Sequence, residues 1–341
     1  MLIQAFLPEL ISCAILKFSA EKMKIKFAFG RTLITAGLVL PFLVPAFSQQ
    51  KPQADPQEKP LSYNLTVNAV TIAVTVQDGK GRYINDLGEK DFIIYENKEK
   101  KTITYFQHDQ NAPLSLTVLL DVSGSMALEN KFEECRQALR ILAEKMLAPH
   151  DEIALLVFAD GQVEVATRHS ADKAAFLAAL EKEKAYGKTA LNDAVAVSPE
   201  FAVRAKNEKR ALLLITDGIE NDSQSSAEQA LEIARRVDVP IYVIGYKIPL
   251  AEAILAKHKR APGLTPSGIV DTLNRFALAT GGKAFVIDSM EKLLAAINEI
   301  KKEQSHQYLI GYTSHREDDS YKRIRVVTVK GKYRIRTRQG Y

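Results

Sequence analysis

The sequence predicts an α/β protein: a doubly wound, mostly parallel sheet inserted in, or flanked by, a β-sandwich-like domain made of the N- and C-terminal strands. From residue 115 onward, near-continuous apolar strands alternate with stretches of helical period; the strands read LTVLL, EIALLVF, ALLLIT and IYVIG. Such strands separated by helices are typical of a parallel sheet covered on both faces. On either side of this region, the alternation of apolar and polar residues predicts further β-strands.

The length and charge of the chain limit the classes of function. A chain of 341 residues is long enough for two domains. The net charge is +5, and residues 1–48 carry five basic and two acidic side chains, so the remainder carries only about +2. Because a nucleic-acid-binding surface needs a strong positive charge, we do not expect nucleic acid as a partner.

The N-terminal segment, residues 1–48, has the pattern of an export signal, and Met23 is an alternative start. A basic stretch precedes an apolar run, and small residues up to Ser48 precede a polar segment. The apolar run is short and contains two prolines, so we expect cleavage near Ser48 and no integral membrane span in the mature chain. An uncleaved N-terminal anchor is the alternative. The expected location is extracytoplasmic: periplasm, cell surface or medium. Residues 49–60 are polar and rich in proline, as in a linker.

The expected elements follow in order along the chain. Residues 61–110 form an N-terminal β segment, in which DFIIYE and KTITYFQ flank Asn97-Lys98 as a hairpin. Residues 113–304 form the α/β domain. Within it, VEVATRH follows EIALLVF after four residues, so the two strands should be antiparallel at a sheet edge. Residues 305–341 form a C-terminal β segment, which we expect to pair with 61–110 because either half alone would leave open edges.

Three smaller features give further expectations. The last helix should begin near Asp288, because Asp288 and Glu291 fit a capping box. Cys135 would be the lone cysteine of the mature chain, so no intramolecular disulfide is expected; it falls on the apolar stripe of a helix and should be buried. Basic residues of the C-terminal tail alternate with apolar ones, which predicts a basic, solvated strand face, with contact to an anionic glycan or lipid as the alternative.

Short oxygen-bearing side chains follow the predicted strands. LTVLL ends in Asp121-Val-Ser123-Gly-Ser125, the loop with Thr189 precedes a helix, and Asp217 follows ALLLIT. In a doubly wound sheet, ligands bind at the carboxyl edge where the strand order reverses. Because these are hard oxygen donors with no histidine or cysteine beside them, the set suits Mg²⁺, Mn²⁺ or Ca²⁺ rather than zinc.

This set of residues resembles the metal-ion-dependent adhesion site of von Willebrand factor type A domains. The segments GKTALNDAV, LLLITDG and ATGGKAFVI are also similar to that family, and the resemblance covers roughly 113–300. It implies that Ser123 and Ser125 bind the metal directly, that Thr189 does so directly or through water, and that Asp121 and Asp217 act through water. The whole chain resembles exported bacterial proteins with a type A-related domain between β segments.

The resemblance implies an exported, non-enzymatic adhesion or protein-binding module. Neutral hydroxyls around the cation would leave it electron-poor, so that a glutamate or aspartate of a protein partner could complete its coordination. Lys188 stands where the family usually has glycine, and Lys188, Gly218 and Glu220 are the candidate partner contacts. The basic stretch at 250–268 is a partner-facing loop or an idle surface insertion. The sequence does not indicate an oligomeric state.

Three other interpretations remain open from the sequence. Ser125 and Thr189 could cap helices without any metal. A Mg²⁺-dependent phosphohydrolase similar to haloacid dehalogenases could use Asp121, Asp217 and Asp222, although that family needs an aspartate where Ser123 stands. In the third interpretation the cation only stabilises the loops of an envelope scaffold.

Overall fold

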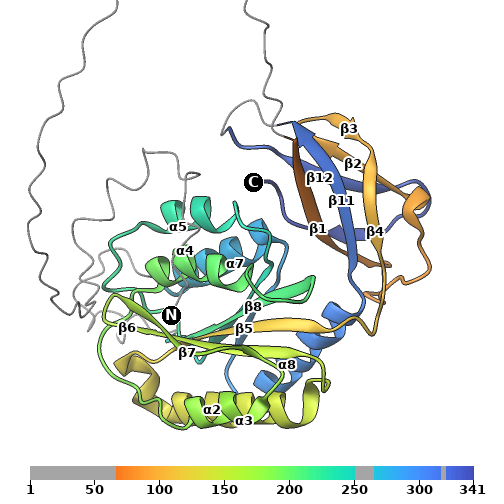
Figure 1. The fold of residues 1–341 in the computed structure, drawn as a ribbon. Coiled ribbons are helices and arrows are strands. Elements are labelled where there is room, and N and C mark those ends of the chain that lie inside the picture. The colour runs from red at the N-terminus through yellow and green to blue at the C-terminus, as the bar shows by residue number, and fades with distance from the viewer. Residues whose placement is uncertain (1–66, 250–264, 316–319) are drawn as a thin grey trace, which may run out of the picture. The chain divides into compact units, whose positions relative to one another are not determined.

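The computed structural model describes residues 67–249, 265–315 and 320–341 (Figure 1). The predicted export signal and linker, and most of the basic stretch at 250–268, lie outside the described residues. In the part of the chain that is described, no helix is both long enough and apolar enough to cross a membrane.

A six-stranded sheet forms the centre of the α/β domain, in the order β10-β9-β8-β5-β6-β7. Its strands are β5 (Leu114–Asp121), β6 (Glu152–Ala159), β7 (Gln162–Ser170), β8 (Lys209–Thr216), β9 (Ile241–Tyr246) and β10 (Ala284–Ile287). Neighbouring strands are parallel, except that β7 pairs antiparallel with β6 at one edge. The prediction of a doubly wound, mostly parallel sheet with an antiparallel edge hairpin is therefore confirmed.

Helices cover both faces of this sheet (Figure 1). One face carries α2 (Lys131–Ile141), η3 (Leu142–Met146), α3 (Lys173–Leu180) and α8 (Met290–Ser305), and the other carries α4 (Leu191–Ala202), α5 (Ala227–Ala234) and α7 (Pro266–Thr280). Side chains of β5 alternate between the two cores, Val118 and Leu120 on one side and Leu119 on the other. Cys135 is buried in the first core.

The terminal β segments join in a second domain of two small sheets. One sheet has the order β13-β1-β11-β4 and the other β12-β2-β3. The strands are β1 (Val67–Gln77), β2 (Phe92–Glu96), β3 (Glu99–Lys101), β4 (Ile103–Gln107), β11 (Tyr308–His315), β12 (Ile324–Thr328) and β13 (Arg334–Arg336), with a short η1 (Glu89–Asp91) before β2. Because β1 pairs with β11 and β2 with β12, N- and C-terminal segments build one sandwich-like core.

Two local expectations need correction. Asn97 and Lys98 have positive φ angles of 48° and 74° and do form a hairpin turn, but only β3 returns along β2. The chain then changes sheet, and β4 pairs with β11, so the run KTITYFQ belongs to two sheets. The helix α8 begins one residue later than predicted, because the Ser289 side chain accepts the Lys292 N–H, while Asp288 pairs with the Lys292 ammonium instead.

A buried charged cluster joins the sandwich-like domain to the α/β domain. Glu303 of α8 is 2% exposed. One of its oxygens accepts hydrogen bonds from Thr75 of β1 and from the Tyr242 hydroxyl of β9, and the other pairs with Arg336 of β13. The buried Arg338 similarly lies 3.4 Å from Asp238. The predicted basic, solvated face is therefore wrong at these two arginines: Arg336 pairs with the buried Glu303, and the buried Arg338 lies beside Asp238, which is partly exposed.

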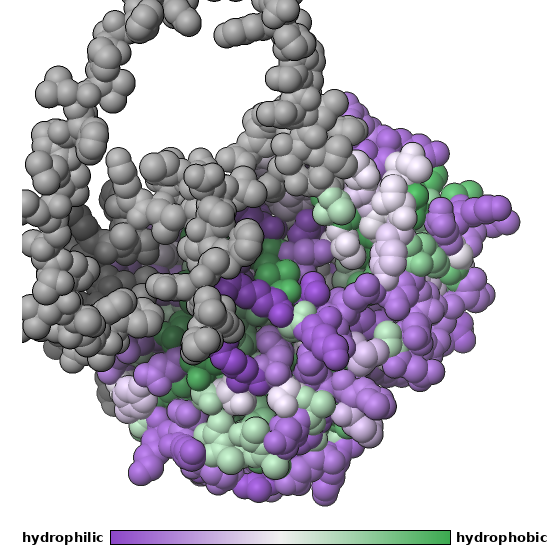
Figure 2. Space-filling view, in the orientation of Figure 1, coloured by the Kyte–Doolittle hydropathy of each residue, from purple (hydrophilic) through white to green (hydrophobic). Residues whose placement is uncertain are grey.

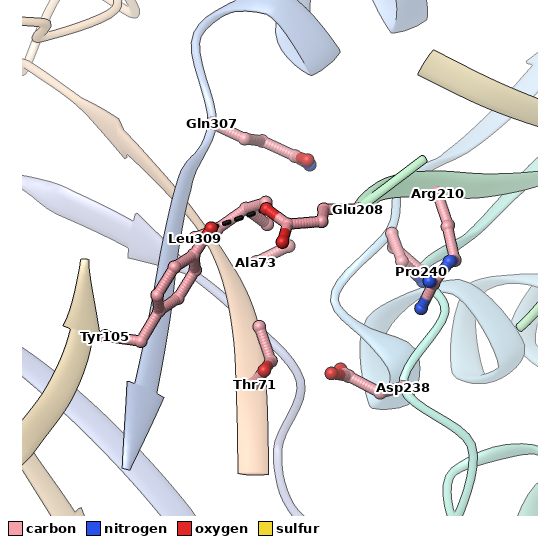
Figure 3. A pocket seen from close by; sticks show the side chains of 9 residues that line it. All are labelled: Thr71, Ala73, Tyr105, Glu208, Arg210, Asp238, Pro240, Gln307 and Leu309. Atoms are coloured by element: carbon pink, nitrogen blue, oxygen red, sulfur yellow. Dashed lines mark hydrogen bonds between the residues drawn. The ribbon is translucent and has the colours of Figure 1, made fainter. Parts of the chain in front are cut away.

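A cavity of about 240 Å³ lies beside this junction, between the first sandwich sheet and the amino ends of β8 and β9. In Figure 3 its lining includes the Tyr105 hydroxyl, which donates a hydrogen bond to Glu208. It is at the opposite end of β8 from Asp217, so it is separate from the predicted metal site.

Hydrophilic residues cover most of the visible described surface in Figure 2, and hydrophobic residues appear there in small groups. The exposed large apolar side chains are spread over both domains rather than gathered on one element. Single exposed apolar residues are normal on a folded protein and carry no functional signal by themselves.

Candidate metal site

The two predicted site aspartates lie at the carboxyl edge of the central sheet. Asp121 is the last residue of β5 and Asp217 directly follows the adjacent strand β8; both are fully buried. After β5 the chain continues to β6 on one side, whereas β8 lies on the other side. The strand order therefore reverses at β5, which is where open α/β sheets bind their ligands.

Backbone contacts hold two loops together: the first loop, which contains Ser123 and Ser125, and the second loop, which contains Thr189. The Gly124 N–H donates to the Gly187 carbonyl at 2.9 Å, and the Tyr186 N–H donates to the Val122 carbonyl at 2.7 Å. Gly187 has a φ of +71°, and a Cβ atom there would lie 2.4 Å from the carboxylate of Asp160. Only glycine fits this position, so the Thr189 loop can lie close to Asp160 in the turn between β6 and β7.

The third loop, which begins at Asp217, is hydrogen-bonded to the second loop through Thr189. The Thr189 N–H donates to the side-chain oxygen of Asn221 at 2.9 Å, and the Thr189 carbonyl accepts the N–H groups of Asn221 and Asp222 at 3.1 and 3.0 Å. The three loops that the sequence analysis singled out are thus joined by direct hydrogen bonds.

The Asp121 carboxylate has internal partners on both oxygens. Oδ1 accepts the Ser123 N–H at 2.9 Å, and Oδ2 accepts the Thr216 hydroxyl at 2.6 Å. Burial raises the pKa of Asp121 to about 7, and the negative charge of the nearby Asp217 adds to the rise. A positive charge placed between the two acids would relieve this repulsion.

The Asp217 carboxylate is bound mainly to a lysine of the first helix. The Lys131 ammonium lies 2.9 Å from Oδ2, and the Ile219 N–H donates to Oδ1 at 3.3 Å. Lys131 opens α2 and is only 3% exposed. Both aspartates are therefore fixed in place by groups of the protein itself.

The hydroxyl groups of Ser123, Ser125 and Thr189 make fewer hydrogen bonds within the protein than the two carboxylates do. Ser123 Oγ and Ser125 Oγ lie 3.1 Å apart, and Ser123 is 1% exposed, as is Thr189. Within the described ranges, no group hydrogen-bonds to the Thr189 hydroxyl. The interpretation of Ser125 and Thr189 as helix caps is wrong: α2 follows Asn130, α4 follows Ala190, and neither has a side-chain cap.

The donor set fits a hard divalent cation. Three hydroxyls and two carboxylates provide oxygen ligands only, and the described residues hold no cluster of three or more histidine, cysteine, aspartate or glutamate side chains. Zinc and softer metals would require the latter kind of site, whereas Mg²⁺, Mn²⁺ and Ca²⁺ accept oxygen donors.

The predicted partner contacts differ in how accessible they are. The Lys188 side chain is 48% exposed and forms an ion pair with Asp222 at 2.8 Å. Gly218 is buried. Both carboxylate oxygens of Glu220 accept hydrogen bonds within the third loop and from the start of α4. The structure thus gives Gly218 and Glu220 internal roles, and Lys188 alone of the three remains a candidate contact.

Three residues that contact the candidate site were not predicted from the sequence: Lys131, Thr216 and Asn221. Thr216 has a detectable signal, because it directly precedes Asp217 at the end of a strand. Lys131 and Asn221 act through contacts between separate loops, and a charged or polar residue near a loop is ordinarily expected to be solvated.

Fold and site together define a doubly wound α/β domain with an oxygen-donor site at its topological switch point. Residues 116–220, which include all five predicted metal ligands, match the von Willebrand factor type A domain family.

Comparison with known proteins gives the following similarities. No curated protein matches the chain. Among solved structures, the conserved hypothetical protein BatB from Bacteroides thetaiotaomicron is similar at 19% identity, with a TM-score of 0.43 over 56% of this chain and 98% of that one. The pilus adhesin SpaC from Lactobacillus rhamnosus GG has 14% identity and a TM-score of 0.46, over 63% and 34% of the two chains. The PilB minor pilin from Streptococcus sanguinis has 14% identity and a TM-score of 0.43, over 57% and 62%.

Proposed function

We propose that the protein is an exported, non-enzymatic adhesion or protein-binding module, in which one divalent cation captures a glutamate or aspartate of a protein partner. One observation carries this proposal. The two buried carboxylates already have partners within the protein, whereas the hydroxyls of Ser123, Ser125 and Thr189 are not used for helix capping.

The assignment of ligands follows from that difference. Ser123 and Ser125 would hold the cation directly, Thr189 directly or through water, and Asp121 and Asp217 through water. The cation, preferably Mg²⁺ with Mn²⁺ or Ca²⁺ as substitutes, supplies a positive charge to which a carboxylate binds. Because hydroxyls are neutral, they leave that charge largely intact for the partner.

Export is part of the proposal and rests on the sequence. The N-terminal 48 residues have a basic stretch, an apolar run and small residues before a polar segment. The proposed location is therefore extracytoplasmic, where the module can bind a protein partner outside the cytoplasm or on another cell.

Cation binding is tested first, by calorimetric titration of the purified protein with Mn²⁺. We expect one ion per chain, and loss of binding in Thr189→Ala. Ser305→Ala is the matched control, because its hydroxyl only bonds the Lys302 carbonyl at the far end of α8. Unchanged Mn²⁺ binding by Thr189→Ala would contradict the site.

Partner capture is tested with immobilised protein and an envelope extract, in Mg²⁺ and in EDTA. We expect capture that requires Mg²⁺ and is absent in Ser123→Ala, while that variant still melts cooperatively. Capture that persists in EDTA would favour the scaffold interpretation. Turnover of a phosphate ester that disappears in Asp121→Asn would favour the phosphohydrolase interpretation.

A further inference from the structure

Lys131 is a buried lysine at the candidate metal site. Its side chain is 4% exposed, and its ammonium lies 2.9 Å from the fully buried Asp217 carboxylate. The other buried residues of α2 are Phe132, Cys135, Ala138 and Leu139, so the helix otherwise buries only apolar side chains. Burying a lysine is costly unless it is paired, so this position has a use that an apolar residue would not serve.

We propose that Lys131 is a built-in counter-charge of the metal site: it lowers the affinity for the divalent cation and leaves the bound cation with net positive charge for a partner's carboxylate. This inference rests on the proposed function. It adds what the hydroxyl ligands alone do not explain, namely why one of the two site acids is paired with a cation that belongs to the protein.

A count of charges shows the effect. When both aspartates are ionised, as they would be beside a bound cation, they carry two negative charges, and the Lys131 ammonium reduces the sum to one. A divalent cation then leaves the site with one net positive charge, whereas without Lys131 the net charge would be zero. Because the three groups are almost completely buried, water screens these interactions much less than at the surface.

The hydrogen bond also has a geometric consequence. Lys131 holds Asp217 Oδ2 and the Ile219 N–H holds Oδ1, so both oxygens are retained by the protein. Direct coordination of the cation by Asp217 Oδ2 would bring the cation close to the Lys131 ammonium, whose positive charge repels it. Lys131 therefore favours an outer, water-mediated role for Asp217 and keeps the cation electron-poor.

The experiment compares Lys131→Met with the wild-type protein in Mn²⁺ titrations followed by calorimetry. Methionine keeps most of the length of the side chain and removes the charge. We expect Lys131→Met to bind Mn²⁺ roughly tenfold more tightly, or better, because a buried like charge is gone. Lys184→Met is the matched control, since Lys184 is exposed on the second loop, and its affinity should equal that of wild type.

The same substitution made in an Asp217→Asn protein shows whether Lys131 acts through Asp217. In Asp217→Asn, adding Lys131→Met should change the Mn²⁺ affinity by less than in the wild-type background, because the two residues form one interacting pair. If Lys131→Met proves unstable in EDTA, Lys131→Gln provides the same removal of charge with a group that can still bond Asp217. Addition of Mn²⁺ should then raise the melting temperature more in either variant than in wild type.

Acetate serves as the probe for the partner's carboxylate. Titrated into Mn²⁺-saturated protein, it should bind more weakly to Lys131→Met than to wild type, because the net positive charge is smaller. Equal or weaker Mn²⁺ affinity in Lys131→Met and Lys131→Gln, with wild type binding normally, would overturn this inference alone. Absence of Mn²⁺ binding in wild type and variants would overturn both the inference and the proposed function.

Discussion

Two buried charged clusters lie at opposite edges of the same sheet. At the carboxyl edge, the candidate metal site contains Asp121, Asp217 and Lys131. At the amino edge, where β9 begins, Tyr242 contacts Glu303, which also pairs with Arg336 of the sandwich-like domain. Both clusters bury acids, but they differ in whether the hydroxyl groups beside those acids already have partners.

We call the cluster at the amino edge the closed cluster, because its carboxylate and its hydroxyl groups have hydrogen-bond or ion-pair partners. Glu303 has partners on both oxygens, and the Tyr242 hydroxyl accepts the side-chain amides of Gln304 and Gln307 at 2.8 and 3.0 Å. Arg336 also donates to the Gly281 carbonyl at 3.0 Å. The candidate metal site differs in its hydroxyl groups. Within the described residues, the Ser123 and Ser125 hydroxyls bond each other, and the Thr189 hydroxyl has no hydrogen bond. The first cluster therefore joins two domains, whereas the second has hydroxyl groups that could bind the proposed cation.

The largest expected effect comes from breaking the closed cluster. Arg336→Met would leave the buried Glu303 carboxylate without its counter-charge, and we expect a loss of about 3–5 kcal/mol in the free energy of unfolding. Urea denaturation measures it. Arg334→Met is the control, because Arg334 is exposed on the same strand, and its effect should stay within about 0.5 kcal/mol. Equal stabilities for the two variants would show that the cluster does not bear on stability.

A substitution in the candidate metal site should have the opposite effect: a small change in stability and a large change in Mn²⁺ affinity. Ser125→Ala removes a hydroxyl whose hydrogen bond is to Ser123 Oγ, so the free energy of unfolding in EDTA should change by less than about 1 kcal/mol. Mn²⁺ affinity, measured by calorimetry, should fall on the order of a hundredfold, because a direct ligand is lost. Arg336→Met should leave that affinity unchanged. A stability loss in Ser125→Ala without a loss of Mn²⁺ affinity would remove the distinction between the two clusters.

The comparison also explains what could be predicted from the sequence. Apolar runs between helical stretches predicted the sheet, because burial on both faces imposes that pattern locally. Asp121 and Asp217 could be placed at one sheet edge, because each follows such a strand. The position of the candidate site could therefore be predicted from the order of strands and loops along the chain.

The remaining features could not be predicted, because they depend on pairing between distant segments. Arg336 alternates with apolar residues and looks like part of a solvated face, yet Glu303 of another domain neutralises it. Lys131 similarly looks like a surface residue at the start of a helix, yet Asp217 lies 86 positions away in sequence and directly beside it in space. A hydrophobic period identifies buried apolar residues and says nothing about buried charges that have partners.

A smaller effect is expected from Thr216, which supports the site without being a ligand. Its hydroxyl donates to Asp121 Oδ2 at 2.6 Å and accepts the Gly218 N–H at 2.9 Å. Thr216→Val keeps the shape and removes both bonds, so the free energy of unfolding in EDTA should fall by about 1–3 kcal/mol. Thr328→Val on β12 is a control for the substitution itself. A loss no greater than in the control would mean that Asp121 does not depend on this bond.

The smallest effect is expected at the rim of the site, where the ion pair of Lys188 and Asp222 is open to solvent. Lys188→Met should change the free energy of unfolding by less than about 1 kcal/mol, and the change should shrink as salt is added, because water and ions screen an exposed pair. If Lys188 contacts an acidic partner, the same variant should slow partner association at low salt while Mn²⁺ affinity is unchanged. Stopped-flow or surface-binding kinetics with a captured partner measures the association rate, and calorimetry the Mn²⁺ affinity. A large loss of stability would instead place Lys188 with the closed cluster, as a structural residue.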